Sequence, residues 1–222
     1  MSKFSVAIDG PAGAGKSTIA KKVAEKLNFV YVDTGAIYRT VGLAANRRGL
    51  APDDHVNIPA MLPSLIIDMR YVDGVQKMFL GEEDVSDQIR TPVISVYASC
   101  VGAMPEVRAF LMDMQRQMAA QYNVLMDGRD IGTVVLPDAE LKIFMTASAE
   151  ARAQRRYKEN LSKGFDSDLN QIIEEIKARD WQDTHRQHSP LMKADDAVVL
   201  DTSDMNIDEV VAAIEALLPN NK

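Results

Sequence analysis

The stretch that decides the fold spans residues 3–18 and reads KFSVAIDGPAGAGKST. Residues 3–8 form a short run rich in Phe, Val and Ile, which predicts a buried strand, and Asp9-Gly10-Pro11 is a typical strand end. After Lys16 the apolar residues repeat with the 3.6-residue period of an amphipathic helix, at Ile19, Ala20, Val23, Ala24 and Leu27. The stretch therefore predicts a strand, a glycine-rich loop and a helix in succession.

The loop of this stretch fits the pattern GxxxxGK[ST], the phosphate-binding loop or P-loop. Its glycines let successive backbone N–H groups point into one concavity, and the following helix adds unpaired N–H donors and the positive end of its dipole. We expect a nucleoside triphosphate to bind at Gly10, Pro11, Ala12, Gly13, Ala14, Gly15, Lys16, Ser17 and Thr18. Lys16 would reach the β and γ phosphates, and the Ser17 hydroxyl would complete the coordination of Mg²⁺.

Predicted strands and helices alternate along the chain, except in a central region that contains two consecutive β-prone runs. Further strands are predicted at residues 29–32, 124–126, 141–146 and 197–200, and helices at 35–48, 91–104, 105–122, 149–161, 169–183 and 207–218. Two β-prone runs, 65–72 and 75–80, flank Asp73-Gly74, a pair favoured in type I′ hairpin turns. This order predicts an α/β fold with a five-stranded parallel sheet flanked by helices and an inserted antiparallel β-hairpin, in a single domain over residues 1–222.

Composition limits the classes of function. The 222 residues include 25 Lys and Arg against 32 Asp and Glu, and the net charge of -7 opposes binding to nucleic-acid backbones or anionic lipid surfaces. One Cys and three His leave no multi-cysteine zinc site. The sequence lacks the long apolar run of a membrane span or a signal peptide. We therefore expect a cytoplasmic monomer with neither nucleic-acid nor membrane partners.

Proteins with a P-loop include both kinases and nucleotide-dependent switches, and the arginines of this chain favour a kinase. The chain contains neither Asn-Lys-x-Asp nor Asp-x-x-Gly, which are typical of a GTPase switch, and instead offers arginines near predicted strand ends: Arg39, Arg108, Arg129, Arg179 and Arg186. Such a set suits a phosphate monoester as acceptor, because that group is already a nucleophile at neutral pH and needs no general base. Two alternatives stay open. One is a P-loop kinase acting on another monophosphate or on an alcohol, with Asp33 as the candidate base, and the other is a nucleotide-dependent binding switch.

Several segments together resemble the bacterial cytidylate kinase family, in that family's order and spacing, over nearly the whole chain. They are residues 10–18, DTGAIYR at 33–39, DGRDIGT at 127–133, KIF at 142–144, and Arg179-Asp180 followed by Asp183 and Arg186. The resemblance implies a nucleoside monophosphate kinase fold and transfer of the γ-phosphate of ATP to CMP or dCMP, with Mg²⁺ as cofactor. It also implies a monophosphate-binding insertion at residues 60–105 and a lid and acceptor-binding segment at residues 150–187.

The resemblance further implies roles for individual side chains. The acceptor phosphate would be held by Arg39, Arg129 and Arg186, with a hydroxyl contact from Thr34. The cytosine edge would be read by Ser99, Arg108 and Asp130, and the sugar would contact Arg179 and Asp183. The lid would cover ATP with Arg152, Arg155 and Arg156. Catalysis would depend on Lys16, Arg129 and Arg186, while the ligand of Mg²⁺ stays open between Ser17 and Thr18.

Overall fold

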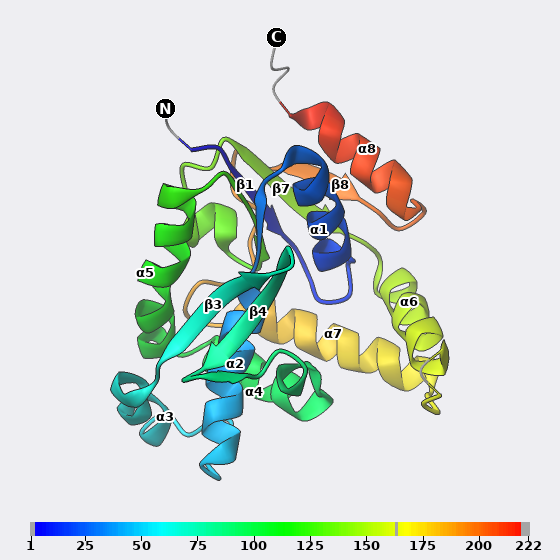
Figure 1. The fold of residues 1–222 in the computed structure, drawn as a ribbon. Helices are drawn as coiled ribbons and strands as arrows, with labels where there is room; N and C mark the ends of the chain where they lie inside the picture. The colour runs from blue at the N-terminus through cyan, green and yellow to red at the C-terminus, as the bar shows by residue number, and fades with distance from the viewer. Residues whose placement is uncertain (1–2, 163, 219–222) are drawn as a thin grey trace. The chain divides into compact units, whose positions relative to one another are not determined.

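A computed structural model describes residues 3–162 and 164–218 (Figure 1). The chain divides into two compact units. One unit combines Met1–Tyr31 with Gln121–Lys222, and the other is Val32–Ala120. The first unit contains the glycine-rich loop and most of the central sheet, and the second contains the hairpin region.

The central sheet has five strands in the order β2-β6-β1-β7-β8, which confirms the predicted number. Their bounds are β1 Ser5–Asp9, β2 Val30–Asp33, β6 Val124–Gly128, β7 Leu141–Thr146 and β8 Val198–Asp201. β1 pairs in parallel with both β6 and β7, and β7 pairs in parallel with β8. Because the register sets Asp9 opposite Gly128 and Phe144, the carboxyl ends of the three middle strands lie side by side.

Two helices of the first unit, α7 (Leu169–His185) and α8 (Ile207–Leu217), begin at residues whose side chains cap them. Two further helices of this unit are α1 Lys16–Leu27 and α6 Ala149–Ser162. The Asp168 carboxylate accepts a hydrogen bond from the Gln171 N–H at the start of α7. Asn206 and Glu209 form a reciprocal capping box at the start of α8. A one-turn π-helix, η3, covers Ile131–Val135 after β6 and was not predicted.

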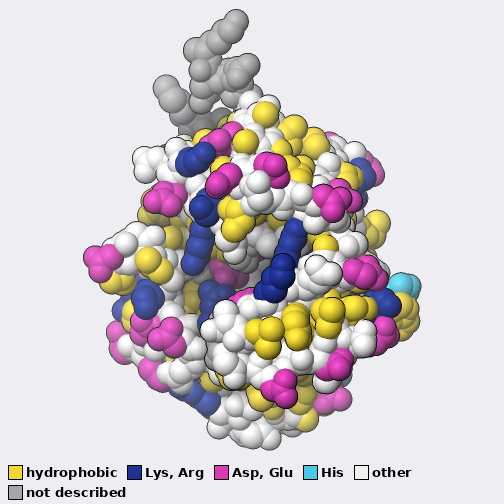
Figure 2. All heavy atoms as spheres, turned by 90° about the vertical axis from the view of Figure 1, so that its right-hand side faces the viewer, with side chains coloured by type: hydrophobic (Ala, Val, Ile, Leu, Met, Phe, Trp, Pro, Cys, Tyr) yellow, Lys and Arg dark blue, Asp and Glu magenta, His cyan; other side chains and the backbone are white. Residues whose placement is uncertain are grey.

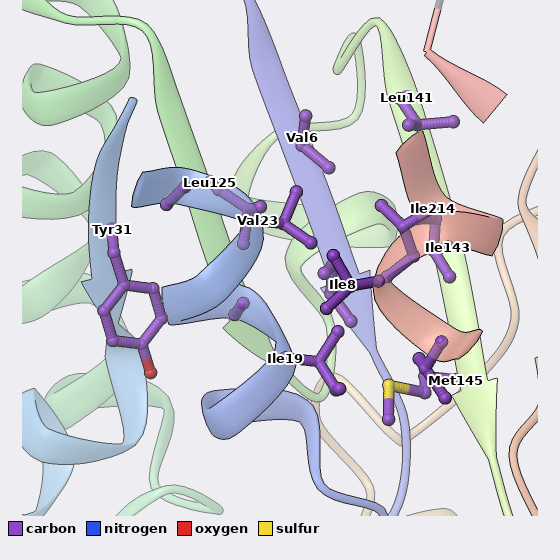
Figure 3. Close-up of a cluster of buried hydrophobic side chains, with 14 residues drawn as sticks. Val6, Ile8, Ile19, Val23, Tyr31, Leu125, Leu141, Ile143, Met145 and Ile214 are labelled. Carbon is purple, nitrogen blue, oxygen red and sulfur yellow. The ribbon is translucent and has the colours of Figure 1, made fainter. Parts of the chain in front are cut away.

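A continuous apolar cluster holds the first unit together (Figure 3). All five residues of β1 are buried, as expected for a strand with neighbours on both sides. Ile19 and Val23 of α1 and Ile214 of α8 point toward Ile8 and Ile143 of the sheet. A second, smaller cluster joins α6 to α7 through Ala153, Ile172 and Ile176.

The second unit surrounds α2 with short elements. Their bounds are α2 Thr34–Arg47, α3 Asn57–Met61, η1 Leu62–Ser64, β3 Ile67–Val72, β4 Val75–Leu80, β5 Glu83–Asp84, η2 Gln88–Arg90, α4 Pro92–Val101 and α5 Pro105–Gln121. The predicted hairpin is confirmed, since β3 and β4 are antiparallel and both turn residues, Asp73 and Gly74, have positive φ of 52° and 75°. The short elements α3, β5 and η2 were not predicted.

Charged side chains of both signs are interspersed over the face of the molecule in Figure 2. Among the described residues, no helix is long and apolar enough to cross a bilayer.

Candidate active site

The glycine-rich loop leaves the end of β1 through a conformation that only glycine adopts easily. Gly10 has φ of 151°, and a Cβ atom at this position would lie 1.9 Å from the backbone oxygen of Met145 in β7. Gly15, with φ of 86°, occupies the N-cap of α1 and has no side chain that could occupy the first N–H donors of that helix. The loop therefore presents backbone donors beside the carboxyl ends of the middle strands.

Lys16 lies within this loop and is buried. Its Nζ donates a hydrogen bond to the Pro11 carbonyl oxygen at 2.7 Å, so the ammonium group lies inside the concavity of the loop. Burial and, to a smaller extent, the positive charge of Arg129 lower the pKa of Lys16 to about 7 against the opposite effects of Asp127 and Asp9. An anion bound in the loop would favour the charged form of this lysine.

Ser17 and Asp127 form a polar pair at the end of β6. The Ser17 hydroxyl donates to one oxygen of Asp127 at 2.9 Å, and the Tyr31 hydroxyl donates to the other oxygen at 2.8 Å. Asp127 was not predicted as a site residue, although the apolar run at 124–126 followed by a carboxylate at a strand end was the available signal.

This pair suits Mg²⁺. Magnesium is commonly bound through one or two protein oxygen ligands, and substrate phosphates and waters complete its octahedron. A buried carboxylate beside a hydroxyl at the start of the loop helix supplies such ligands. Within residues 3–162 and 164–218 there is no group of three or more His, Cys, Asp or Glu that could enclose a metal by itself.

Asp9, the last residue of β1, is a second buried carboxylate that was not predicted as a site residue. Its two oxygens accept hydrogen bonds from the backbone N–H groups of Ile131 and Gly132, both at 2.7 Å. Burial raises the pKa of Asp9 to about 6 against the opposite effect of these two bonds, and the charge of Asp130 raises it while that of Lys16 lowers it. Asp9 thus joins the start of the P-loop to the segment that follows β6.

The predicted acceptor residues of the first unit pair with one another. Arg129 Nε donates to the Asp183 carboxylate at 2.8 Å, and Arg186 Nη2 lies 3.7 Å from the Asp130 carboxylate. Asp130 and Asp183 are both buried. Arg179 lies on α7 and is partly buried. Residues 129–130 and 179–186 therefore come together although nearly fifty residues separate them in sequence.

The predicted lid arginines have different surroundings. Arg152 is buried and donates to the carbonyl oxygens of Ala12 and Ala147 and to both oxygens of Asp180. Arg155 donates to the backbone and hydroxyl oxygens of Thr202. Arg156 forms an exposed ion pair with Glu175 of α7 at 3.1 Å. Arg152 therefore links α6 to both the P-loop and α7.

Two aromatic rings stack on the outer side of α7. The centroids of Trp181 and His185 are 4.7 Å apart with an interplanar angle of 15°, and Trp181 is 65% exposed. Neither residue was assigned a role from the sequence.

The remaining predicted acceptor residues belong to the second unit. Asp33 accepts a hydrogen bond from the Ala36 N–H at the start of α2, and its carboxylate lies 2.9 Å from Arg90 Nη2 and 3.9 Å from Arg39 Nη1. Arg90 was not predicted. Thr34, the first residue of α2, is buried, and Ser99 lies partly buried on α4. Arg108 is buried, and it donates to the Gly102 carbonyl oxygen at 3.1 Å and lies over the Tyr38 ring.

A buried lysine in a glycine-rich loop between strand and helix, on a five-stranded parallel sheet, defines the class of P-loop nucleotide-binding proteins. Residues 6–220 match the family described as cytidylate kinase. A cytidylate kinase of Leuconostoc mesenteroides is 51% identical over 100% of this chain and 99% of its own length. A cytidylate kinase of Listeria innocua is 52% identical over 97% of this chain and 96% of its own length.

This chain belongs to the cytidylate kinase family. Among solved structures, shikimate kinase from Bacteroides thetaiotaomicron has the same fold, with a TM-score of 0.50 and 13% identity over 96% of this chain and 97% of its own. The predicted kinase fold and the resemblance are both confirmed, whereas the roles predicted for individual residues stay predictions.

Proposed function

We propose that this chain transfers the γ-phosphate of ATP to CMP or dCMP, giving ADP and CDP or dCDP, with Mg²⁺ bound at Ser17 and Asp127. One observation supports the proposal beyond family membership. Next to the P-loop lysine, the end of β6 holds two guanidinium–carboxylate pairs, Arg129 with Asp183 and Arg186 with Asp130. Guanidinium groups at this position suit a phosphate, and the carboxylates suit a sugar hydroxyl and an exocyclic amine.

Charge neutralisation and alignment account for the reaction in this proposal. Charged Lys16 would neutralise the transferred phosphate, and Arg129 and Arg186 would exchange their carboxylate partners for the oxygens of the acceptor phosphate. When bound, Mg²⁺ supplies additional positive charge to the β and γ phosphates. A general base is not needed, because the acceptor phosphate is mostly a dianion at neutral pH. Several residues stay predictions as nucleotide contacts: Thr34, Arg39, Ser99, Arg108, Arg152, Arg155, Arg156 and Arg179.

The proposal favours a monophosphate acceptor over an alcohol. An alcohol would require a carboxylate to accept its proton, and the candidate from sequence was Asp33. The Asp33 carboxylate instead caps α2 and pairs with Arg90. This engagement argues against Asp33 as a general base.

The test measures ADP release from ATP and Mg²⁺ with CMP, dCMP, UMP, AMP, GMP or no acceptor. Acceleration confined to CMP and dCMP is the expected result. Equal rates with and without every monophosphate would contradict the transferase, and a preference for another base would overturn the assignment of the acceptor. As a matched pair, Asp130→Asn should raise KM for CMP about 10-fold or more, whereas Asp138→Asn, on an exposed side chain of the same segment, should leave it unchanged.

The metal ligands need a separate measurement, which is the Mg²⁺ concentration that gives half of the maximal rate. Asp127→Asn and Ser17→Ala should both raise this concentration, because each removes an oxygen ligand. Thr18→Val should raise it less than Ser17→Ala. The reverse order would assign the ligand to Thr18.

A further inference from the structure

The short helix η3, Ile131–Val135, begins directly after two predicted acceptor residues, Arg129 and Asp130. The first N–H groups of any helix lack partners within the helix, and an Asp at the N-cap ordinarily accepts a hydrogen bond from one of them. Asp130 occupies this N-cap position with φ of -147° and ψ of 29°. In the part of the chain that the structure describes, its side chain nevertheless makes no capping hydrogen bond.

Asp9 accepts those hydrogen bonds instead. One carboxylate oxygen accepts from the Ile131 N–H and the other from the Gly132 N–H, each at 2.7 Å, although Asp9 lies more than 120 residues away in the sequence. Asp9 is 4% exposed. A Cβ atom at Gly132 would lie 3.4 Å from the Asp9 carboxylate, at the limit of ordinary contact, and 3.2 Å from the flexible Lys142 side chain. Both oxygens of Asp9 are thus committed to the start of η3.

The Asp130 carboxylate contacts an arginine and does not cap the helix that it precedes. It lies 3.7 Å from Arg186 Nη2 and is itself buried. An Asp that capped its own helix would accept from the N–H group of the second or third residue, here Gly132 or Thr133. The two carboxylates therefore compete in principle for the Gly132 N–H group, and in the structure Asp9 holds it.

We propose that Asp9 is a positioning residue that caps η3 in place of Asp130, and that it thereby keeps the Asp130 carboxylate directed at the cytosine of the acceptor. This inference rests on the proposed function, since Asp130 is assigned to the acceptor base and Asp9 only to the position of Asp130. Asp9 itself does not touch the substrate. Its effect on the reaction passes through the backbone of residues 131–132.

Asp9 is also the titratable member of this arrangement. The charged groups that face it are Lys16 from α1 and Asp130 from the segment before η3, and the aliphatic part of Lys142 from β7 packs against Gly132 beside it. Burial raises the pKa of Asp9 to about 6. Protonation would turn one acceptor oxygen into a hydroxyl that faces an N–H group. The cap should therefore weaken as the pH falls through about 6.

The test is a double-mutant cycle on the full chain with Asp9→Asn, Asp130→Asn and the double variant. Asp9→Asn keeps one acceptor oxygen and sets an amide NH₂ against the other N–H group. It should raise KM for CMP about 10-fold or more while KM for ATP changes little. In the Asp130→Asn background the same substitution should add almost nothing to KM for CMP. Additive effects, or an equal rise in KM for ATP, would overturn the proposal.

The matched control is Glu140→Gln. Glu140 is a carboxylate that accepts hydrogen bonds from the N–H and hydroxyl of Ser5, at the opposite end of β1. Its replacement should leave KM for CMP unchanged even if the stability falls. A rise in KM for CMP as large as that of Asp9→Asn would show that any lost contact of β1 has this effect, and would overturn the inference.

The pH profile supplies a readout that a merely structural role would not move. The ratio of KM for CMP in Asp9→Asn to that in the native chain should be large at pH 7.5 and approach one as the pH falls through about 6. Titration of the CMP phosphate occurs in both proteins and cancels in the ratio. A constant ratio would contradict the proposal.

Two further outcomes are distinguishable. If Asp9→Asn does not fold, Asp9→Glu replaces it in the same cycle, because a longer carboxylate keeps the charge but shifts the cap; additivity with Asp130→Asn would again overturn the inference. If the native chain shows no CMP-dependent ADP release, the proposed function fails and this inference fails with it. If the native chain shows CMP-dependent ADP release but the effects of the two substitutions are additive, the inference about Asp9 fails while the proposed function stands.

Discussion

The edge of the central sheet that bears the P-loop and the α6–α7 pair belong to the same unit, but they are stabilised in different ways. At the sheet edge, buried strands and helices form the large apolar cluster, and buried side chains such as Lys16 and Asp9 bond to backbone atoms. Between α6 and α7 only a small apolar cluster is found among the described residues, and exposed ion pairs surround it. A large apolar cluster and bonds to backbone atoms hold the first region, whereas the second has a smaller cluster and more pairs between side chains.

The largest expected difference between the two regions is in the cost of removing a buried isoleucine. Ile143→Ala, in β7, should lower the free energy of unfolding by about 2–5 kcal/mol, because the surrounding cluster is large and cannot collapse into the cavity. Ile176→Ala, in α7, should cost less than about 2 kcal/mol, because α6 and α7 can adjust or open locally. Urea unfolding of both variants measures this, and equal losses would remove the distinction.

A smaller effect is expected at the link between the two regions. Asp180→Asn removes the carboxylate that binds both terminal nitrogens of Arg152 and leaves a buried guanidinium without a charged partner. We expect protection of the α7 amides from hydrogen exchange to fall by about 1–3 kcal/mol. The control is Glu174→Gln, which removes an exposed pair with Lys177 on the same helix. The same loss of protection in both variants would contradict a special role for Arg152.

The low pKa of Lys16 predicts proton uptake when ATP binds. At pH 8 the unliganded lysine, with a pKa of about 7, is mostly neutral, and bound phosphates should raise its pKa so that up to about one proton is taken up. Calorimetry in buffers of different ionisation enthalpy measures this number. Lys16→Arg should take up none through this group, because arginine stays charged. Equal proton uptake in the two proteins would assign it to another group.

The lowered pKa of Lys16 also predicts how the free energy of unfolding changes with pH. Above pH 7 the native lysine releases its proton, while in the unfolded chain it keeps the proton to about pH 10. The unfolded state therefore binds more protons in this window, so the free energy of unfolding should rise with pH relative to a Lys16→Met variant, by up to about 1.4 kcal/mol per pH unit. A fall relative to that variant would contradict the lowered pKa.

The smallest effect is expected at the exposed side of the α6–α7 pair. Arg156→Ala removes an ion pair in which both side chains are nearly half exposed. The free energy of unfolding should change by no more than about 0.5 kcal/mol, and less in high salt. Thermal unfolding at two salt concentrations checks this. A loss above 2 kcal/mol would indicate that α6 and α7 depend on their surface charges as much as the sheet edge depends on its core.

Local patterns in the sequence were sufficient for much of the fold. Residues 3–27 combine a β-prone run, a P-loop pattern and a helical period, and all three elements form as predicted. The type I′ turn at Asp73-Gly74 follows from two residues whose positive φ is favoured in such turns. By contrast, β5 is two residues long and η3 is five, so neither is long enough for a hydrophobic pattern to repeat.

The candidate site was less predictable because its decisive contacts join distant residues. The P-loop and the arginines after β6 could be found, since motif and strand-end position are local features. The bonds of Asp9 to Ile131 and Gly132 depend on the pairing of β1 with β6, which no single segment specifies. The same holds for Arg90, which joins Asp33 only after the second unit has folded.

The stacked pair on α7 has a practical consequence. Trp181 is the one tryptophan of the chain, so all indole emission arises from a single exposed point on the helix that Arg152 ties to the P-loop. The chain therefore contains its own optical reporter, and stopped-flow fluorescence can follow α7 during nucleotide binding without any attached dye.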